Sequence, residues 1–172
     1  MTIIIVDGFS FEFKNAKAAF KFDETNKGLS TYHGVISLKA VDIVAEFENY
    51  YLFVEIKDYT RLSRQFDDYT GLKNSLKYKF RDTFLYRYAE NKIDKPIRYI
   101  CLLNGMDNVS CKRFCKDLNY ELPVGVKNKK RWQYELVESC FVVNLDRWNK
   151  NFPDWYVQKI TNPNSNNNPQ YF

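Results

Sequence analysis

The sequence lacks any apolar run of the length that a membrane-spanning helix requires. The one early apolar run, Thr2 to Val6, has no basic segment before it and no small-residue cleavage site after it, so we see no secretory signal. Histidine occurs once and cysteine four times in 172 residues, without the ligand spacing of a zinc site. We therefore expect a cytoplasmic protein with reduced thiols and no membrane partner.

Several catalytic motifs are also missing. There is no glycine-rich phosphate loop, no Gly-x-Ser-x-Gly, no His-Glu-x-x-His and no paired Cys-x-x-Cys. The net charge of +5 is too small to indicate a nucleic-acid-binding protein by itself. Function must therefore be sought in the pattern of individual charged residues.

The composition is that of a folded chain. Hydrophobic residues make up 45% of the sequence and aromatic residues 17%, which is too apolar for a disordered protein. The length suits a single domain, which we place at residues 1–160. Residues 161–172 contain five asparagines and two prolines, and this composition predicts a disordered tail.

Residues 41–47 and 50–57 are the clearest predicted strands, because both are rich in β-branched and aromatic side chains. If the two residues between them form the turn of a hairpin, Asp42 lies directly opposite Glu55. One face of this hairpin is then wholly apolar and packs on the core, with Ile43, Ala45, Phe47, Leu52, Val54 and Ile56. We expect the other face, which carries Asp42, Glu55 and Lys57, to point toward solvent.

The remaining pattern predicts an α/β (α+β) chain with a central mixed sheet of four to five strands flanked by helices. Strands are predicted at 2–6, 10–13, 97–103 and 139–145, and helices at 65–91, at about 107–118, and at 146–160 with an interruption at Pro153. The inward stripe of the long helix is Tyr69, Leu72, Leu76, Phe80, Phe84 and Tyr88. Residues 15–34 give mixed signals, with alanines favouring a short helix and glycines favouring a loop.

The residues that carry chemistry are Asp42, Glu55, Ile56 and Lys57. Two facing carboxylates repel each other unless a proton or cation lies between them, and Mg²⁺ is commonly held by one or two carboxylates plus waters. The Ile56 carbonyl is a further candidate ligand, and strand alternation puts Lys57 on the same side as Glu55. An ammonium group there would orient or help to deprotonate a water that attacks a phosphodiester.

This Asp-x₁₂-Glu-x-Lys arrangement resembles the site of the PD-(D/E)xK nuclease superfamily, with Val41 in place of the usual proline. The resemblance covers roughly residues 15–118. It implies a restriction endonuclease-like or Holliday-junction resolvase-like core, with Asp42 and Glu55 binding Mg²⁺ or Mn²⁺. It also implies that Lys57 assists the nucleophilic water in DNA hydrolysis.

The same resemblance implies two accessory features. Many members have an acidic residue in the first helix as a second metal contact, for which Glu12, Asp23 and Glu24 are candidates and Glu24 is preferred. A subset has a Gln-x-x-x-Tyr motif after the lysine, and Gln65 and Tyr69 fit that spelling.

Candidate DNA contacts come from the long helix. Lys73, Lys77 and Arg81 recur every four residues and form a like-charge stripe that a phosphate backbone would relieve, as would neighbouring acidic side chains. His33 is an additional candidate proton carrier near the site. So small a nuclease would need a homodimer or a partner subunit to cut both strands.

The sequence therefore predicts a metal-dependent nuclease acting on DNA. The alternative is a catalytically inactive nuclease-fold protein that acts as a nucleic-acid-binding or protein-interaction module. A third interpretation makes Glu55 and Lys57 an ordinary exposed strand edge with cross-strand ion pairs.

Overall fold

The computed structural model describes the chain except residues 33, 35–36, 61–67, 126–130, 133–134 and 161–172. Its larger sheet has five strands in the order β3-β4-β5-β6-β7, and its smaller sheet has three in the order β1-β2-β8. The strands are β1 (Thr2–Val6), β2 (Phe9–Phe13), β3 (Ala18–Lys21), β4 (Ile43–Glu46), β5 (Tyr51–Asp58), β6 (Ile97–Asn104), β7 (Ser139–Val143) and β8 (Trp155–Lys159). The helices are α1 (Tyr69–Ala89), α2 (Asn108–Glu121) and α3 (Leu145–Asn151).

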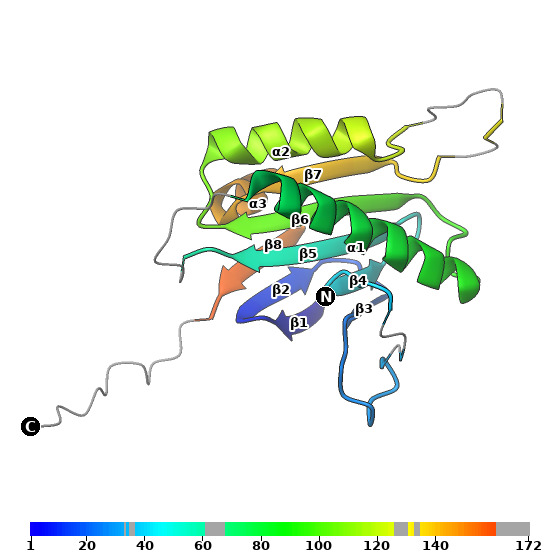
Figure 1. Ribbon diagram of the computed structural model, residues 1–172. Coiled ribbons are helices and arrows are strands. Elements are labelled where there is room, and N and C mark those ends of the chain that lie inside the picture. Colours follow the sequence, from blue (N-terminus) through cyan, green and yellow to red (C-terminus); the bar gives the residue numbers. More distant parts are fainter. Residues whose placement is uncertain (33, 35–36, 61–67, 126–130, 133–134, 161–172) are drawn as a thin grey trace, which may run out of the picture.

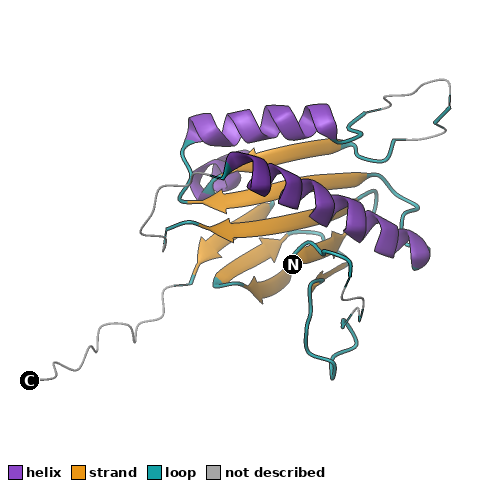
Figure 2. Ribbon diagram, in the orientation of Figure 1, coloured by secondary structure: helices purple, strands orange, loops and turns teal. Residues whose placement is uncertain are grey.

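The molecule has three layers, with the five-stranded sheet in the middle (Figures 1 and 2). Helices α1 and α2 cover one face and form a core with alternate residues of β4 to β7. The small sheet and α3 cover the opposite face and form a second core, centred on Phe11 and Trp148. The sheet is mixed, because β3, β4 and β5 pair antiparallel whereas β5, β6 and β7 pair parallel. The predicted α/β class is therefore confirmed, while the finer likeness to restriction endonucleases belongs to the proposal below.

The register of the β4–β5 hairpin is the one that the sequence predicts. Ile43 pairs with Val54 and Glu46 with Tyr51, so continuing the same register places Asp42 opposite Glu55. The predicted apolar face is buried in the second core. The expectation that the other face points toward solvent is wrong, because α1 packs on it and leaves Asp42 2% and Glu55 0% exposed.

Helix α1 begins four residues later than the sequence predicts. The Asp68 side chain accepts a hydrogen bond from the backbone N–H of Gly71 and caps the helix, which is a favoured role for aspartate. Leu72, Leu76 and Phe80 are buried as expected, but Tyr88 is 60% exposed because the helix end projects past the sheet. Gln65 lies outside the described residues.

Two segments differ in type from the prediction. No helix forms at residues 15–20, because Ala18–Lys21 pairs with Ile43–Glu46 as an additional strand. The second half of the predicted 146–160 helix is β8, which pairs with β2 after Pro153 ends α3. Helix α2 begins as predicted, with Asp107 accepting hydrogen bonds from the N–H groups of Val109 and Ser110.

None of the four cysteines is in a disulfide, as the sequence predicts. In the described part of the chain no helix is both long and apolar enough to cross a membrane. The predicted disordered tail, residues 161–172, lies outside the described residues.

Candidate functional site

The predicted site residues converge where β5 ends. Glu55 and Lys57 lie in the second half of β5, close to its carboxyl end. Asp42 immediately precedes β4, which pairs antiparallel with β5. In open sheets with parallel strands, ligands commonly bind beyond the carboxyl ends of the strands. The position of the three residues is therefore one where a binding site is expected.

A lysine that the sequence did not single out links the two carboxylates. The Lys79 ammonium lies 3.1 Å from Asp42 Oδ1 and 2.9 Å from Glu55 Oε2, and the side chain is only 16% exposed. The second oxygen of Glu55 lies 2.5 Å from the Lys57 ammonium. Two buried acids thus face two lysines, one from the strand and one from α1.

Helical spacing is the signal that would have found Lys79. It follows Leu72 by seven residues and Leu76 by three, so it lies on the inward face of α1. A lysine on such a face requires an anionic partner beneath it, because a buried ammonium is costly when unpaired. Facing carboxylates on the strand below supply that partner.

The Asp42 side chain and the backbone at residues 41 and 42 are held by three hydrogen bonds. The Ile56 N–H donates to Asp42 Oδ2 at 2.5 Å, and the Val41 N–H donates to Thr83 Oγ1 on α1 at 2.9 Å. The Phe22 N–H donates to the Asp42 carbonyl at 2.9 Å. Asp42 is therefore fixed to β5, to α1 and to the end of β3 before any ligand binds.

The electrostatics reflect the crowding of carboxylates. Burial, and then the charge of Asp42, raise the pKa of Glu55 to about 7 against the opposing effect of its two lysines. Burial lowers the pKa of Lys79, but the charges of Glu55 and Asp42 outweigh it and the net change is upward. Lys79 is therefore a permanent cation in this site.

Asp23 is a further acidic residue that interacts with this cluster, through Asp42. Burial and the neighbouring Asp42 raise the pKa of Asp23 to about 7. The preferred candidate, Glu24, instead accepts a hydrogen bond from the Asn26 N–H at 2.7 Å. Both line a cavity of about 550 Å³ that reaches Lys79. Glu12, the third candidate, does not line this cavity and lies on β2 in the small sheet. The structure describes no helix before α1 among the residues that it covers, and the loop after β3 carries Asp23 and Glu24 instead.

The donor set fits a single small cation only in part. Asp42 and Glu55 already converge on one cation, the Lys79 ammonium, which shows that their geometry suits a shared positive charge. Among the described residues, however, no group of three or more His, Cys, Asp or Glu side chains is arranged to hold a metal ion. A metal here would therefore take its remaining ligands from water or from backbone oxygens such as that of Ile56.

The predicted DNA stripe is paired within the protein. Lys73 lies 2.6 Å from Glu121 of α2, and Lys77 also pairs with Glu121. Arg81 pairs with Asp82 at 2.7 Å and remains 66% exposed. Neighbouring acids thus relieve the stripe, which is the second of the two possibilities that the sequence leaves open.

Tyr69, the one accessory candidate among the described residues, makes its contacts with α2. The Tyr69 hydroxyl donates to Asp117 at 2.8 Å, and its ring stacks on Phe114 in the contact between α1 and α2. His33 and Gln65 lie outside the described residues. The residues that the structure brings together are therefore Asp42, Glu55, Lys57, Lys79 and Asp23.

Comparisons with protein-family models, curated proteins and solved structures find no match to this chain.

Proposed function

We propose that the protein is a metal-dependent hydrolase of DNA phosphodiester bonds. One observation carries the proposal: Asp42 and Glu55 lie in facing register at the end of β5 and share a single cation, with Lys57 beside them. This is the constellation that the resemblance to PD-(D/E)xK nucleases requires. Asp23 and Lys79 line a cavity at the edge of the cluster, and the Lys57 side chain is 33% exposed.

Each residue of the cluster would have its own role in hydrolysis. Asp42 and Glu55 would hold a Mg²⁺ or Mn²⁺ ion, which supplies stabilisation of charge that develops on the phosphate. Lys57, 33% exposed, is the ammonium with access to solvent and would orient the attacking water. Lys79, more deeply placed, would keep the two carboxylates at a fixed separation and would yield part of its contact when a metal binds.

A second function has a specific observation in its favour. Because Lys57 and Lys79 together supply two positive charges to Asp42 and Glu55, the cluster is also stable as a purely internal ion network. The protein would then be an inactive nuclease-fold module that binds nucleic acid or protein. A metal titration separates the two functions, because an ion that binds only the folded chain raises its melting temperature.

The deciding experiment combines that titration with cleavage assays. Mg²⁺ and Mn²⁺ are expected to raise the melting temperature and to support cleavage of supercoiled, linear or single-stranded DNA. Glu55→Gln should abolish both effects, and Glu46→Gln is the matched control, because Glu46 is a β4 carboxylate paired with Lys95. Absence of both stabilisation and cleavage for the parent protein would leave the inactive module as the better description.

A further inference from the structure

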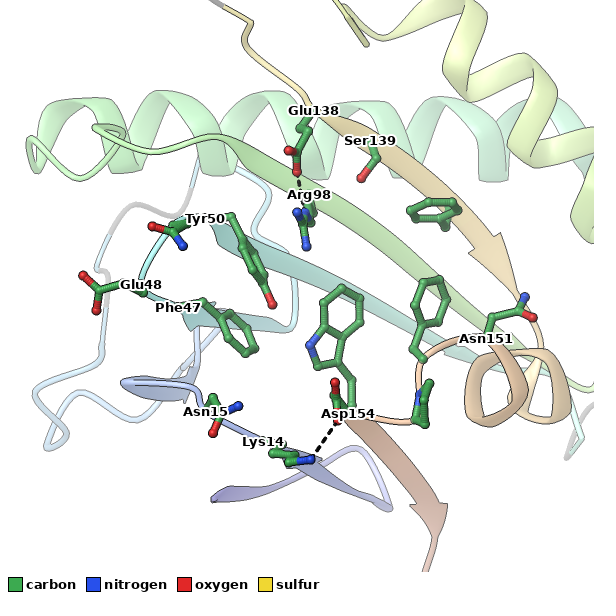
Figure 3. Close-up of a pocket in the computed structure, with 15 residues that line it drawn as sticks. Lys14, Asn15, Phe47, Glu48, Tyr50, Arg98, Glu138, Ser139, Asn151 and Asp154 are labelled. Carbon is green, nitrogen blue, oxygen red and sulfur yellow. Dashed lines mark hydrogen bonds and ion pairs between the residues drawn. The ribbon is translucent and has the colours of Figure 1, made fainter.

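A second cavity lies at the other end of the sheet. It has a volume of about 690 Å³, within the range of small-molecule sites. It opens where the parallel strands begin, next to Tyr50, Arg98 and Ser139 (Figure 3). The candidate site, in contrast, lies where β5 ends. All its aromatic residues except Phe141 belong to the core on the small-sheet side, so this cavity and the candidate site lie on different faces of the five-stranded sheet.

The wall of this cavity consists mainly of flat side chains. Phe47 stacks on Tyr50 with ring centroids 4.4 Å apart, and Phe152 stacks on Trp155 at 5.1 Å. Phe141, 38% exposed, adds an edge contact to Phe152. Aromatic walls of this kind favour a planar ligand.

Arg98 gives the cavity a second kind of flat surface. Its guanidinium lies over the Tyr50 ring, 3.9 Å from the ring centroid, and its Nε donates to Glu138. One face of the guanidinium is thus stacked on Tyr50, while the side chain remains 33% exposed. Nucleobases stack on arginine planes as well as on aromatic rings.

The rim has hydrogen-bonding groups but a nearly balanced charge. Three asparagines and a serine line the cavity, namely Asn15, Asn49, Asn151 and Ser139. Arg98 pairs with Glu138, and Lys14 pairs with Asp154 at 3.4 Å. Amide groups match the donors and acceptors on the edges of bases, and the paired charges favour a neutral ring over a strongly charged one.

We infer that this cavity binds a nucleobase, with the ring stacked against Arg98 and the aromatic wall and with its edge recognised by the asparagines. The inference goes beyond the proposed hydrolysis and does not depend on it. The base would come either from a free nucleoside or from single-stranded DNA. Both sources present the same planar, hydrogen-bonding ring.

The test measures binding to the full-length protein in a buffer that contains chelator, so that no metal-dependent reaction contributes. The probes are adenosine, a short single-stranded DNA oligonucleotide and, as a ligand without a base, ribose. Calorimetry reports affinity, and tryptophan fluorescence reports occupancy because Trp155, one of the three tryptophans, lines the cavity. Adenosine, the oligonucleotide or both should bind saturably, and ribose should not.

Two variants locate the binding. Arg98→Lys keeps the charge but removes the plane, and Phe141→Ala removes an exposed wall residue; each should weaken binding at least about fivefold, the lower end of one stacking contact. Tyr156→Ala is the matched control, because Tyr156 is an aromatic residue of β8 that is 43% exposed and does not line the cavity. It should leave affinity unchanged.

The pattern across probes identifies the source of the base. If adenosine binds and both variants weaken its binding, the cavity is a nucleoside site. If only the oligonucleotide binds and both variants weaken its binding, the cavity takes a base of single-stranded DNA. The inference is overturned if neither probe binds up to about 1 mM, or if both variants bind like the parent. It is also overturned if ribose binds as well as adenosine.

Discussion

At the scale of single residues, Lys57 and Lys79 differ in access although both contact Glu55. Lys57 is 33% exposed and Lys79 is 16% exposed and also contacts Asp42. A group that positions a solvent water must be reachable by solvent, whereas a group that separates two acids need not be. Substituting each lysine should therefore have different consequences.

Lys57→Ala should separate catalysis from binding. The two carboxylates stay in place, so metal affinity should change little, whereas cleavage should fall by orders of magnitude because the attacking water loses its partner. Metal affinity by calorimetry and the cleavage rate under saturating metal are the measurements. Equal cleavage by parent and variant would show that Lys57 has no catalytic part.

Lys79→Met should destabilise the metal-free protein. Removing the buried cation leaves Asp42 without its ion pair and Glu55 with Lys57 alone, and breaking a buried pair typically costs about 3–5 kcal/mol of unfolding free energy. Added Mg²⁺ or Mn²⁺ should then stabilise the variant more than the parent, because the ion no longer competes with an ammonium. Denaturant unfolding with and without metal measures both effects.

The matched control is Lys95→Met, since Lys95 is similarly covered at 17% exposure but pairs with Glu46 away from the site. Metal should stabilise this control no more than it stabilises the parent. If metal stabilises Lys95→Met and Lys79→Met equally, the carboxylates facing Lys79 are not the metal site.

At the scale of elements, α1 positions the segment that carries Asp42. Thr83 on α1 is fully buried, and its hydroxyl accepts the hydrogen bond of the Val41 N–H. Lys39 N–H donates similarly to Asp82 at 3.0 Å. The helix thus fixes the backbone on both sides of residue 40, and changes in α1 should reach the site through these bonds.

Thr83→Val should disturb the site without altering any of its charges. The variant leaves the Val41 N–H without its acceptor, which costs about 1–3 kcal/mol for a buried group. Asp42 should lose its fixed position, and metal affinity should fall with it. Thr83→Ser retains the hydroxyl and should restore metal affinity; a valine variant that binds metal like the parent would show that α1 does not position Asp42.

A substitution in the contact between α1 and α2 can test whether the Lys73, Lys77 and Arg81 stripe binds DNA. Glu121 holds Lys73 and Lys77, so Glu121→Gln should release both lysines from their charged partner. If the stripe binds phosphates, DNA affinity should rise and its dependence on salt should steepen. Reversing Lys73, Lys77 and Arg81 should have the opposite effect, and unchanged affinity in both variants would leave the stripe as a purely internal ion network.

At the scale of the whole molecule, Asp58 and Lys159 connect the two sheets. The Lys159 ammonium of β8 lies 2.7 Å from Asp58 Oδ2 at the end of β5. Burial opposes the charged form of Asp58, but hydrogen bonds from Lys159, Thr60 and Asn104 lower its pKa to about 2. The bridge therefore contributes to stability in a way that depends on pH.

Because the pKa of Asp58 is lower in the folded chain than its ordinary value of 3.8, the stabilisation is complete above pH 3.8 and is lost as the pH falls through about 2. Lys159→Met should lower the unfolding free energy at neutral pH and flatten its decline between pH 4 and 2. Lys14→Met, which removes an exposed pair with Asp154, should leave that slope unchanged. Urea unfolding across this pH range measures both effects. Parallel plots of unfolding free energy against pH for the parent and Lys159→Met would show that the ion pair with Lys159 does not contribute to the pH dependence.

The sequence by itself determined the hairpin and most of the elements around it. Alternating apolar residues fix which face is buried, and a two-residue turn fixes the register, so the pairing of Ile43 with Val54, and with it the opposition of Asp42 and Glu55, follows from local pattern. Local chemistry likewise offers Asp107 or Ser110 as the cap of α2, and the structure uses Asp107.

Only the tertiary structure decided which element covers the hairpin face that carries Asp42 and Glu55, and which cation pairs with these two carboxylates. Packing of α1 buried Asp42 and Glu55 and brought Lys79 to them, although Lys79 lies 37 residues from Asp42 in the sequence. Edge pairing likewise turned Ala18–Lys21 and Trp155–Lys159 into strands, because sheet neighbours far away in sequence override a helical pattern in a short segment. Strand register is a local property, whereas burial and ion pairing depend on neighbours that local sequence does not specify.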